Sequence, residues 1–241
     1  MTGLQKALAG LALLAALVAA GTIGAAGIGH KYGAWPLPTA RLALEYGFYA
    51  AAGAAALGVL VVLLALVRQR SGGAFTALLA IAAGAGAAYV PWTMHQKEQS
   101  LPALHDVSTD TADPPVFVAL ANERANFENG AAYDPANAAK QRAGYPDIAP
   151  LRSAMPADRL FARALAGVKA QGWQIAAQSA QEGRIEATSV SEWFGFKDDI
   201  VIRIAADGAG ARLDMRSASR TGAHDLGANA ERVRAFLAGL K

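Results

Sequence analysis

The sequence predicts an α+β domain that follows a membrane anchor of three transmembrane helices. Long uncharged stretches dominate residues 1–97, whereas residues 98–241 alternate short helical and strand-like patterns. The uncharged stretches predict the anchor, and the later patterns predict the order helix, four strands, helix. We therefore expect an α-β-β-β-β-α domain whose four-stranded antiparallel sheet is covered by two helices on one face.

The predicted spans lie at about residues 7–29, 46–67 and 72–94, which contain no charged side chain. Each run is long enough to cross a hydrocarbon core about 30 Å thick. A lipid bilayer is therefore the expected partner of the first 97 residues. A cleaved signal peptide is the alternative for the first run, but its length and the two later spans argue against it.

Charge is distributed unevenly between the anchor and the domain. Up to Glu98 there are six Lys and Arg against two acidic residues, and the remainder has sixteen basic and seventeen acidic residues. The domain therefore lacks the net basic field that holds a nucleic-acid backbone, and we expect no nucleic-acid partner. The chain has no cysteine, which excludes disulfides and thiolate metal sites, and no motif predicts a cofactor.

Basic residues near the span ends predict the orientation. With a cytoplasmic N-terminus, three basic residues fall on each side of the membrane. The turn Arg68–Arg70 carries the densest cluster and favours the cytoplasmic side. We expect an integral protein of the bacterial inner membrane with its domain in the periplasm.

The elements of the domain follow from periodicity and punctuation. A helix is predicted over residues 156–172 and a second over 226–240, where Asp225 suits the N-cap. Strands are predicted at 173–180, 184–194, 200–206 and 212–220, and residues 105–110 are a candidate for one more.

Alternation assigns the sheet residues to two faces. Ile200, Ile202 and Ile204 share the face toward the helices. Glu186, Arg203 and Arg216 fall on the other face, which we expect to lie open to water or to a partner. The preceding segment, about residues 101–156, is irregular and rich in proline, but its stretch PPVFVALANER is apolar enough to pack on the domain.

The stretch SEWFGFKDDIVIRI contains a dense charged group, Lys197-Asp198-Asp199. We interpret it as a turn between two strands, because Asp in turns commonly bonds local backbone. A catalytic or metal-binding role is the alternative. Adjacent carboxylates on a strand point to opposite faces, which is poor geometry for chelation.

A second polar cluster contains Arg216, Arg220, His224 and Asp225. Arg216 and Arg220 recur on one strand face and could clamp an anion or carboxylate, as could Arg203. The alternative is ion pairing across strands with Glu186 or Asp214. A Ser-His-Asp arrangement with Ser217 or Ser219 is less favoured, because no G-x-S-x-G elbow is present. The start of the last helix, at DLGAN, is a further candidate for anion binding.

A third group contains His105, Asp106, Asp110 and Asp113. These side chains could bind a hard metal ion, but their spacing matches no known loop. Turn and cap roles for the aspartates are favoured, and we predict no metal site.

Several motifs in order suggest a family. The runs HDVSTDTADPPVF, YPDI, IEATSVSEWFGFKDDIVIRI and RLDMRSASRTGAHDLGANAERVRAFL together resemble the domain of unknown function 1499. The resemblance covers about residues 105–240 and implies a bacterial domain that often follows membrane spans and has plastid relatives. It implies no activity and no catalytic residue.

We therefore expect a membrane-anchored envelope protein that binds a partner protein, or a lipid-like or anionic small ligand, through its domain. Tethering to the bilayer favours lipid-related ligands and membrane-protein partners. The alternative is a membrane-tethered hydrolase or transferase that uses His224 and Asp225, or His105 and Asp106. A purely structural assembly factor is a third hypothesis.

Overall fold

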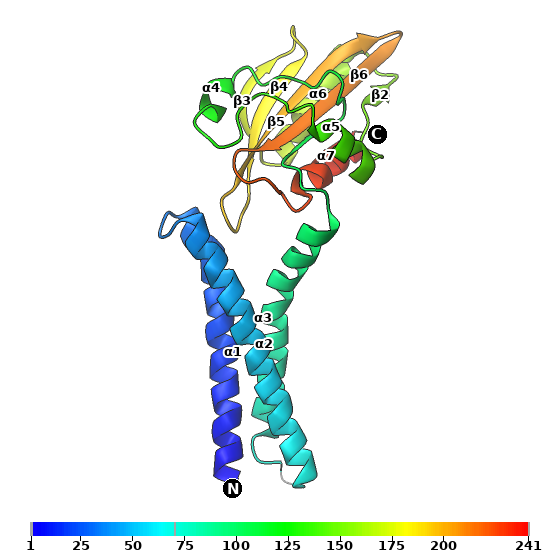
Figure 1. Cartoon of the computed structure of the whole chain (residues 1–241). Helices are drawn as coiled ribbons and strands as arrows, with labels where there is room; N and C mark the ends of the chain where they lie inside the picture. Colours follow the sequence, from blue (N-terminus) through cyan, green and yellow to red (C-terminus); the bar gives the residue numbers. More distant parts are fainter. Residues whose placement is uncertain (1, 70, 241) are drawn as a thin grey trace. The chain divides into compact units, whose positions relative to one another are not determined.

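The computed structural model describes residues 2–69 and 71–240 (Figure 1). Arg70 of the predicted basic cluster lies outside the described residues. The chain forms two compact units. One contains Met1–Gln96 and Glu192–Gly195, and the other contains Lys97–Ser191 and Phe196–Lys241.

The first unit is built from long helices. They are α1 (Thr2–Lys31), α2 (Leu37–Val67) and α3, which spans Ala74–Ser100 and so continues into the second unit. Three helices are long and apolar enough to cross a membrane, which confirms this part of the predicted fold class. Small residues permit close packing between them. A Cβ added at Gly84 would lie 2.6 Å from the carbonyl oxygen of Ala51, so α2 and α3 touch through their backbones.

The second unit contains a six-stranded antiparallel sheet with the strand order β1-β6-β5-β4-β3, and β2 also pairs with β6. The long strands are β3 (Gln174–Ser179), β4 (Arg184–Val190), β5 (Lys197–Asp207) and β6 (Gly210–Ser219). The predicted α+β class and antiparallel sheet are confirmed. The strand number is not, because β1 (Asp106–Ser108), which lies in the candidate segment 105–110, and β2 (Leu151–Ser153), which was not expected, pair with opposite ends of β6. Strands of three residues are too short to produce a visible alternation.

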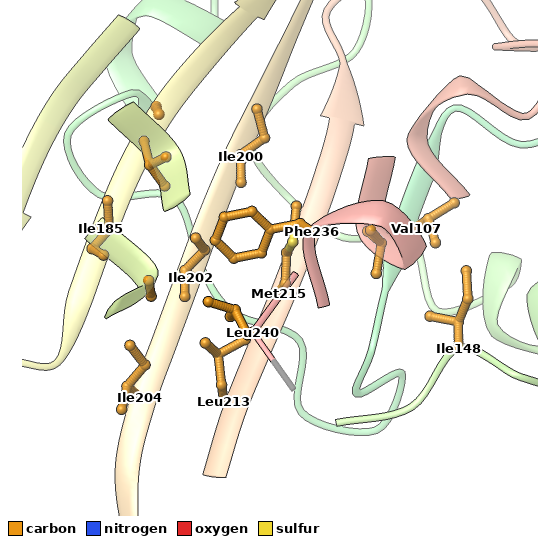
Figure 2. Close-up of a cluster of buried hydrophobic side chains, with 14 of the residues drawn as sticks. Val107, Ile148, Ile185, Ile200, Ile202, Ile204, Leu213, Met215, Phe236 and Leu240 are labelled. Atoms are coloured by element: carbon orange, nitrogen blue, oxygen red, sulfur yellow. The ribbon is translucent and has the colours of Figure 1, made fainter. Parts of the chain in front are cut away.

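Both long helices of this unit lie on one face of the sheet, as predicted. They are α6 (Ala157–Ala170) and α7 (Ala228–Ala238), so α7 begins two residues later than expected. Figure 2 shows Ile200, Ile202, Leu213 and Met215 of β5 and β6 near Phe236 of α7. Each of these four strand residues is fully buried. This apolar layer is the main core of the domain.

The opposite face is covered by a long loop that we call the strap, residues 109–136, which includes the single turn α4 (Ala121–Arg124). Phe117 and Leu120 of the strap are buried against Val201 and Ala218 of the sheet. The stretch PPVFVALANER therefore packs on the domain, as predicted. The prediction of an open polar face is wrong, because Glu186 and Arg216 are both 0% exposed beneath the strap.

The strap is followed by α5 (Asn137–Gly144), which is attached to the edge of the sheet. The side-chain amide of Gln141 donates to the carbonyl of Ser108 at 2.6 Å and accepts from its backbone N–H at 2.9 Å. The amide therefore copies the pairing of a neighbouring strand. This pair of hydrogen bonds fixes α5, and with it Arg142, beside the end of β1.

Candidate functional site

Asp199 is the centre of a buried ionic cluster beneath the strap. Its Oδ2 accepts hydrogen bonds from Nη1 of Arg124 and Nε of Arg220, both at 2.8 Å. Its Oδ1 accepts from the hydroxyl of Thr188 at 2.7 Å and from Nη2 of Arg220 at 2.9 Å. Asp199 thus joins the strap, through Arg124, to β4 and β6. Glu123 also pairs with Arg220 and balances the second cation.

The cluster is charged at neutral pH. Burial by itself would raise the pKa of Asp199, but hydrogen bonds from Arg220, Thr188 and Arg124 outweigh it and lower the pKa below its ordinary value. Burial lowers the pKa of Arg124, yet a guanidinium group remains protonated in proteins. The arrangement is therefore a carboxylate shared by two cations.

Lys197-Asp198-Asp199 lies in strand β5 and not in a turn, which corrects the prediction. The two carboxylates do point to opposite faces, as expected for a strand. Asp198 accepts from Nη2 of Arg232 on α7 at 2.6 Å, whereas Asp199 binds the strap. The strand can continue through both carboxylates because each is neutralised by an arginine from the layer that it faces.

Asp106 and Arg216 form a second buried ion pair on the same face. Nη2 of Arg216 donates to Oδ2 of Asp106 at 2.7 Å, Nε donates to Oδ1 at 3.0 Å, and Nη1 reaches the carbonyl of Pro115 at 3.3 Å. The ring of Phe117 separates the two ionic groups, with its centroid 4.8 Å from the guanidinium carbons of both Arg216 and Arg124.

The strap is also held through its backbone. Glu186 of β4 accepts hydrogen bonds from the N–H groups of three consecutive residues at 2.9, 3.1 and 3.0 Å, namely Val118, Ala119 and Leu120. One buried carboxylate thus satisfies three donors that precede α4.

Arg203 lies at the rim of this face and is half-buried. It donates to Asp113 at 2.8 Å and to Asp214 at 3.1 Å. Arg212 donates to Asp110 at 2.5 Å, and Asp110 also accepts from the N–H groups of Ala112 and Asp113. Asp110 thus has the turn role that the sequence favoured, and burial, which raises its pKa, is outweighed by these hydrogen bonds so that the pKa falls below the ordinary value.

The three predicted clamp arginines, Arg203, Arg216 and Arg220, therefore share one face of the sheet. Each forms an ion pair with a carboxylate of the domain itself. Arg216 pairs with Asp106 and Arg220 with Asp199, rather than with the Glu186 and Asp214 that the alternation suggested. A clamp on an external anion stays a prediction for these residues, and the geometry gives them a role in attaching the strap.

His224 and Asp225 lie in the loop before α7 and do not meet these arginines. The carboxylate of Asp225 accepts from the N–H groups of Gly227 at 2.8 Å and Asn229 at 2.9 Å, so it satisfies a donor in the first turn of α7. The N-cap residue itself is Gly227 and not Asp225, which corrects the prediction. Gly227 has φ +83°, and an added Cβ would lie 2.9 Å from Leu101. Nδ1 of His224 accepts from the N–H of Leu226 at 2.9 Å, and its Nε2 is buried without a partner among the described residues.

The serines near this loop are also held in structural contacts. Ser217 donates to Asn229 Oδ1 at 2.7 Å, and Ser219 accepts from Nδ2 of the same asparagine at 2.9 Å. Neither hydroxyl is recorded bonding to His224. Among residues 2–69 and 71–240, no three His, Asp or Glu side chains gather in a group that could hold a metal ion.

A different feature presents a charged group to solvent. A pocket of about 370 Å³ lies beside α5 and is lined by Thr109, Thr111, Gln141, Arg142, Tyr145, Pro146 and Ile148. Arg142 is exposed, and its Nη1 donates to the hydroxyl of Thr111 at 3.1 Å. The residues lining this pocket include no carboxylate. Within the described chain, no acidic group forms a salt bridge with Arg142.

Sequence reasoning missed Arg124, Gln141 and Arg142. Their partners are far away along the chain. Arg124 and Asp199 are 75 residues apart, and Gln141 and Ser108 are 33 apart. The local signal around Arg142, an arginine in a short helix, is indistinguishable from a solvated surface residue.

The fold and these contacts define a class of protein: an α+β domain with a strapped sheet, attached to three candidate membrane-spanning helices. A comparison with protein families matches residues 106–240 to the family described as Protein of unknown function (DUF1499). The match covers more than half of the chain, so the chain belongs to this family, and the resemblance seen in the sequence is confirmed. No curated protein and no solved structure matched the chain.

Proposed function

We propose that this protein is a membrane-anchored binding protein of the cell envelope. Its domain captures a partner protein, or a lipid-like or anionic small ligand, close to the bilayer. The observation that supports the proposal is a contrast between arginines. Those beneath the strap are paired with internal carboxylates, whereas Arg142 lines an accessible pocket that contains no acidic side chain.

Binding is favoured over hydrolysis or group transfer by the positions of the candidate catalytic groups. His224 accepts a backbone hydrogen bond through Nδ1, and Asp225 accepts one from Asn229 in the first turn of α7. Asp106 is committed to Arg216. A general base must reach the proton that it removes, and among the described residues no serine or threonine hydroxyl bonds to His224 or His105, while Ser217 and Ser219 bond to Asn229.

Native mass spectrometry of the full chain, extracted in mild detergent, tests the proposal. We expect a retained small molecule or a co-purifying subunit. A protein that is recovered folded but bare, even when extracted directly from its own membranes, would count against a binding function. The separate variants His224→Ala and Asp225→Asn should keep the retained species, because neither residue lines the pocket.

The proposed orientation places the domain in the periplasm of a bacterial inner-membrane protein. The basic turn at residues 68–70 supports this side for the domain, because lysine and arginine are enriched in cytoplasmic loops. A phosphatase that requires export, fused after Lys241, should be active. If a cytoplasmic reporter at the same position works instead, the orientation is reversed, while a binding function would be unaffected.

A further inference from the structure

The pocket beside α5 has the composition of a site for an amphiphilic anion. Arg142 and Thr111 form its polar part, and Tyr145, Pro146 and Ile148 contribute apolar surface. Its volume of about 370 Å³ falls in the range of small-molecule sites, roughly 300–1,000 Å³. It therefore has room for an organic group beside an anion.

The polar part is pre-positioned for an oxyanion. Gln141 is only 2% exposed, and both the oxygen and the nitrogen of its side-chain amide bond to the backbone of Ser108. These bonds fix the backbone of α5 next to Arg142. Nη1 of Arg142 donates to Thr111 Oγ1 at 3.1 Å. Because that oxygen accepts from arginine, the hydroxyl proton of Thr111 is directed away from Arg142. The other N–H groups of Arg142 have no recorded partner among the described residues and can donate to a ligand.

The apolar part of the pocket includes Tyr145, which is only 3% exposed and belongs to the main core of the domain. Its buried hydroxyl lies near Gly227, because a Cβ added at that glycine would be 3.6 Å from it. Gly227 does not line the pocket, so other atoms of Tyr145 form its contribution to the pocket surface.

We propose that this pocket binds a small organic oxyanion, with its charged group on Arg142 and Thr111 and a short apolar group toward Tyr145, Pro146 and Ile148. The inference rests on the proposed binding function and names the ligand class. A lipid headgroup and a soluble phosphate ester share this chemistry, so they differ only as sources of the ligand.

The test uses n-butyl phosphate as the probe and the full chain in nanodiscs of phosphatidylcholine. Calorimetric titration should detect binding, and Arg142→Gln should weaken it about tenfold or more, because a hydrogen bond to a charged group is lost. Lys140→Gln is the matched control. It removes one positive charge from another exposed position of α5 but does not line the pocket, so the affinity should change less than about twofold.

Two further probes separate the parts of the site. n-Butanol lacks the anion and should bind at least about tenfold more weakly than n-butyl phosphate, whereas inorganic phosphate lacks the apolar group and should also bind more weakly. Arg142→Lys should recover part of the lost affinity, because it restores charge without the planar fork.

The site is overturned if Arg142→Gln binds n-butyl phosphate as tightly as the unmodified chain, or if the unmodified chain does not bind it. In either case a species retained in native mass spectrometry would leave the proposed binding function intact. Nanodiscs doped with phosphatidic acid identify the source. Weaker apparent binding of the probe there supports the site with a lipid headgroup as occupant, and unchanged binding supports it with a soluble ester.

Discussion

The two faces of the sheet are covered in opposite ways. On one face Ile200, Ile202 and Met215 pack with α6 and α7 in the large apolar core, and the ion pair between Asp198 and Arg232 is a smaller addition to it. On the other face Asp199 and Glu186 hold the strap through ion pairs and hydrogen bonds, with only a small apolar cluster around Phe117. The first layer gains stability from area removed from water, without directional demands. The second depends on geometry, because a buried charge without its partner is costly.

This difference shows that directional polar contacts, and not apolar contacts alone, determine the position of the strap on the sheet. Arg124 reaches Asp199, the carbonyl of Ala218 and the carbonyl of Gly130, so a single side chain fixes the path of the loop around it. An apolar cover could slide by a residue at small cost. An arginine with these acceptors cannot slide without leaving charges unpaired.

The largest effect is expected from Asp199→Asn. Arg124 and Arg220 would keep their charges in a buried site, while the amide presents a donor to one of them. Breaking a buried ion pair in this way typically costs about 3–5 kcal/mol. Urea unfolding of the domain in the full chain, held in mild detergent and followed by near-ultraviolet circular dichroism, should show that loss.

The matched control for this variant is Ile200→Val, the next residue of β5 on the apolar face. Removal of one methylene there should cost about 0.5–1.5 kcal/mol. If Asp199→Asn costs no more than Ile200→Val, the two faces do not differ in the way described, and the strap is held by apolar contacts.

The sequence predicts the two faces of the sheet unequally. The apolar face was predictable, because the alternation of Ile200, Ile202 and Ile204 is local and visible. The strap face was not, because its contacts join residues far apart. Asp106 and Arg216, for example, are 110 residues apart. Polar residues in Lys197-Asp198-Asp199 therefore predicted a turn, although distant arginines allow the strand to contain them.

The candidate site divides in the same way. The alternation of residues along the strands identified Arg203, Arg216 and Arg220 in the sequence. It could not identify the carboxylates of the domain with which these arginines pair, and those carboxylates determine what the arginines do in the fold. Arg142 was not singled out, since its setting depends on the amide of Gln141 pairing with β1 and on the turn that brings Thr111 beside it. A side chain acquires such a setting only after the chain has folded.

The next largest effect is expected from acid, which should lower the stability of the strap face gradually as the pH falls. The pKa of Asp199 is lowered by folding, so the stability it contributes is fully present above its unfolded value of about 3.9 and is lost as the pH falls through the lower folded value. Asp110 has a lowered pKa and acts in the same direction. The urea midpoint should change little between pH 7 and pH 5 and should fall below about pH 4.

The variant Asp199→Asn provides the control for this prediction, because it lacks one of the titrating groups. Its stability should depend less steeply on pH below about 4 than that of the unmodified chain. An equal slope in both proteins would show that other groups cause the acid sensitivity.

A smaller and more local effect is expected from Glu186→Gln. The carboxylate accepts from three backbone N–H groups, and the amide can replace only one of its two oxygens. The loss of charge-assisted hydrogen bonds should cost about 1.5–3 kcal/mol, with faster hydrogen exchange concentrated at residues 118–120. Glu182→Gln is the control, because Glu182, like Glu186, pairs with Arg184 but is exposed and accepts no hydrogen bond from residues 118–120, whose N–H groups donate to Glu186. Uniformly faster exchange throughout the sheet would contradict a local role.

The smallest effect is expected from Asp147→Asn, which removes an ion pair outside both layers. Asp147 accepts two hydrogen bonds from Arg234 at 2.6 and 2.7 Å, and these bonds lower its pKa. The side chains are 55% and 39% exposed, so water solvates both charges after the pair is broken. The expected cost is below about 1 kcal/mol and should shrink further in high salt. A cost as large as that of Asp199→Asn would mean that burial beneath the strap is not what makes the ionic face strong, since Asp147 and Asp199 each accept from both Nε and Nη2 of one arginine.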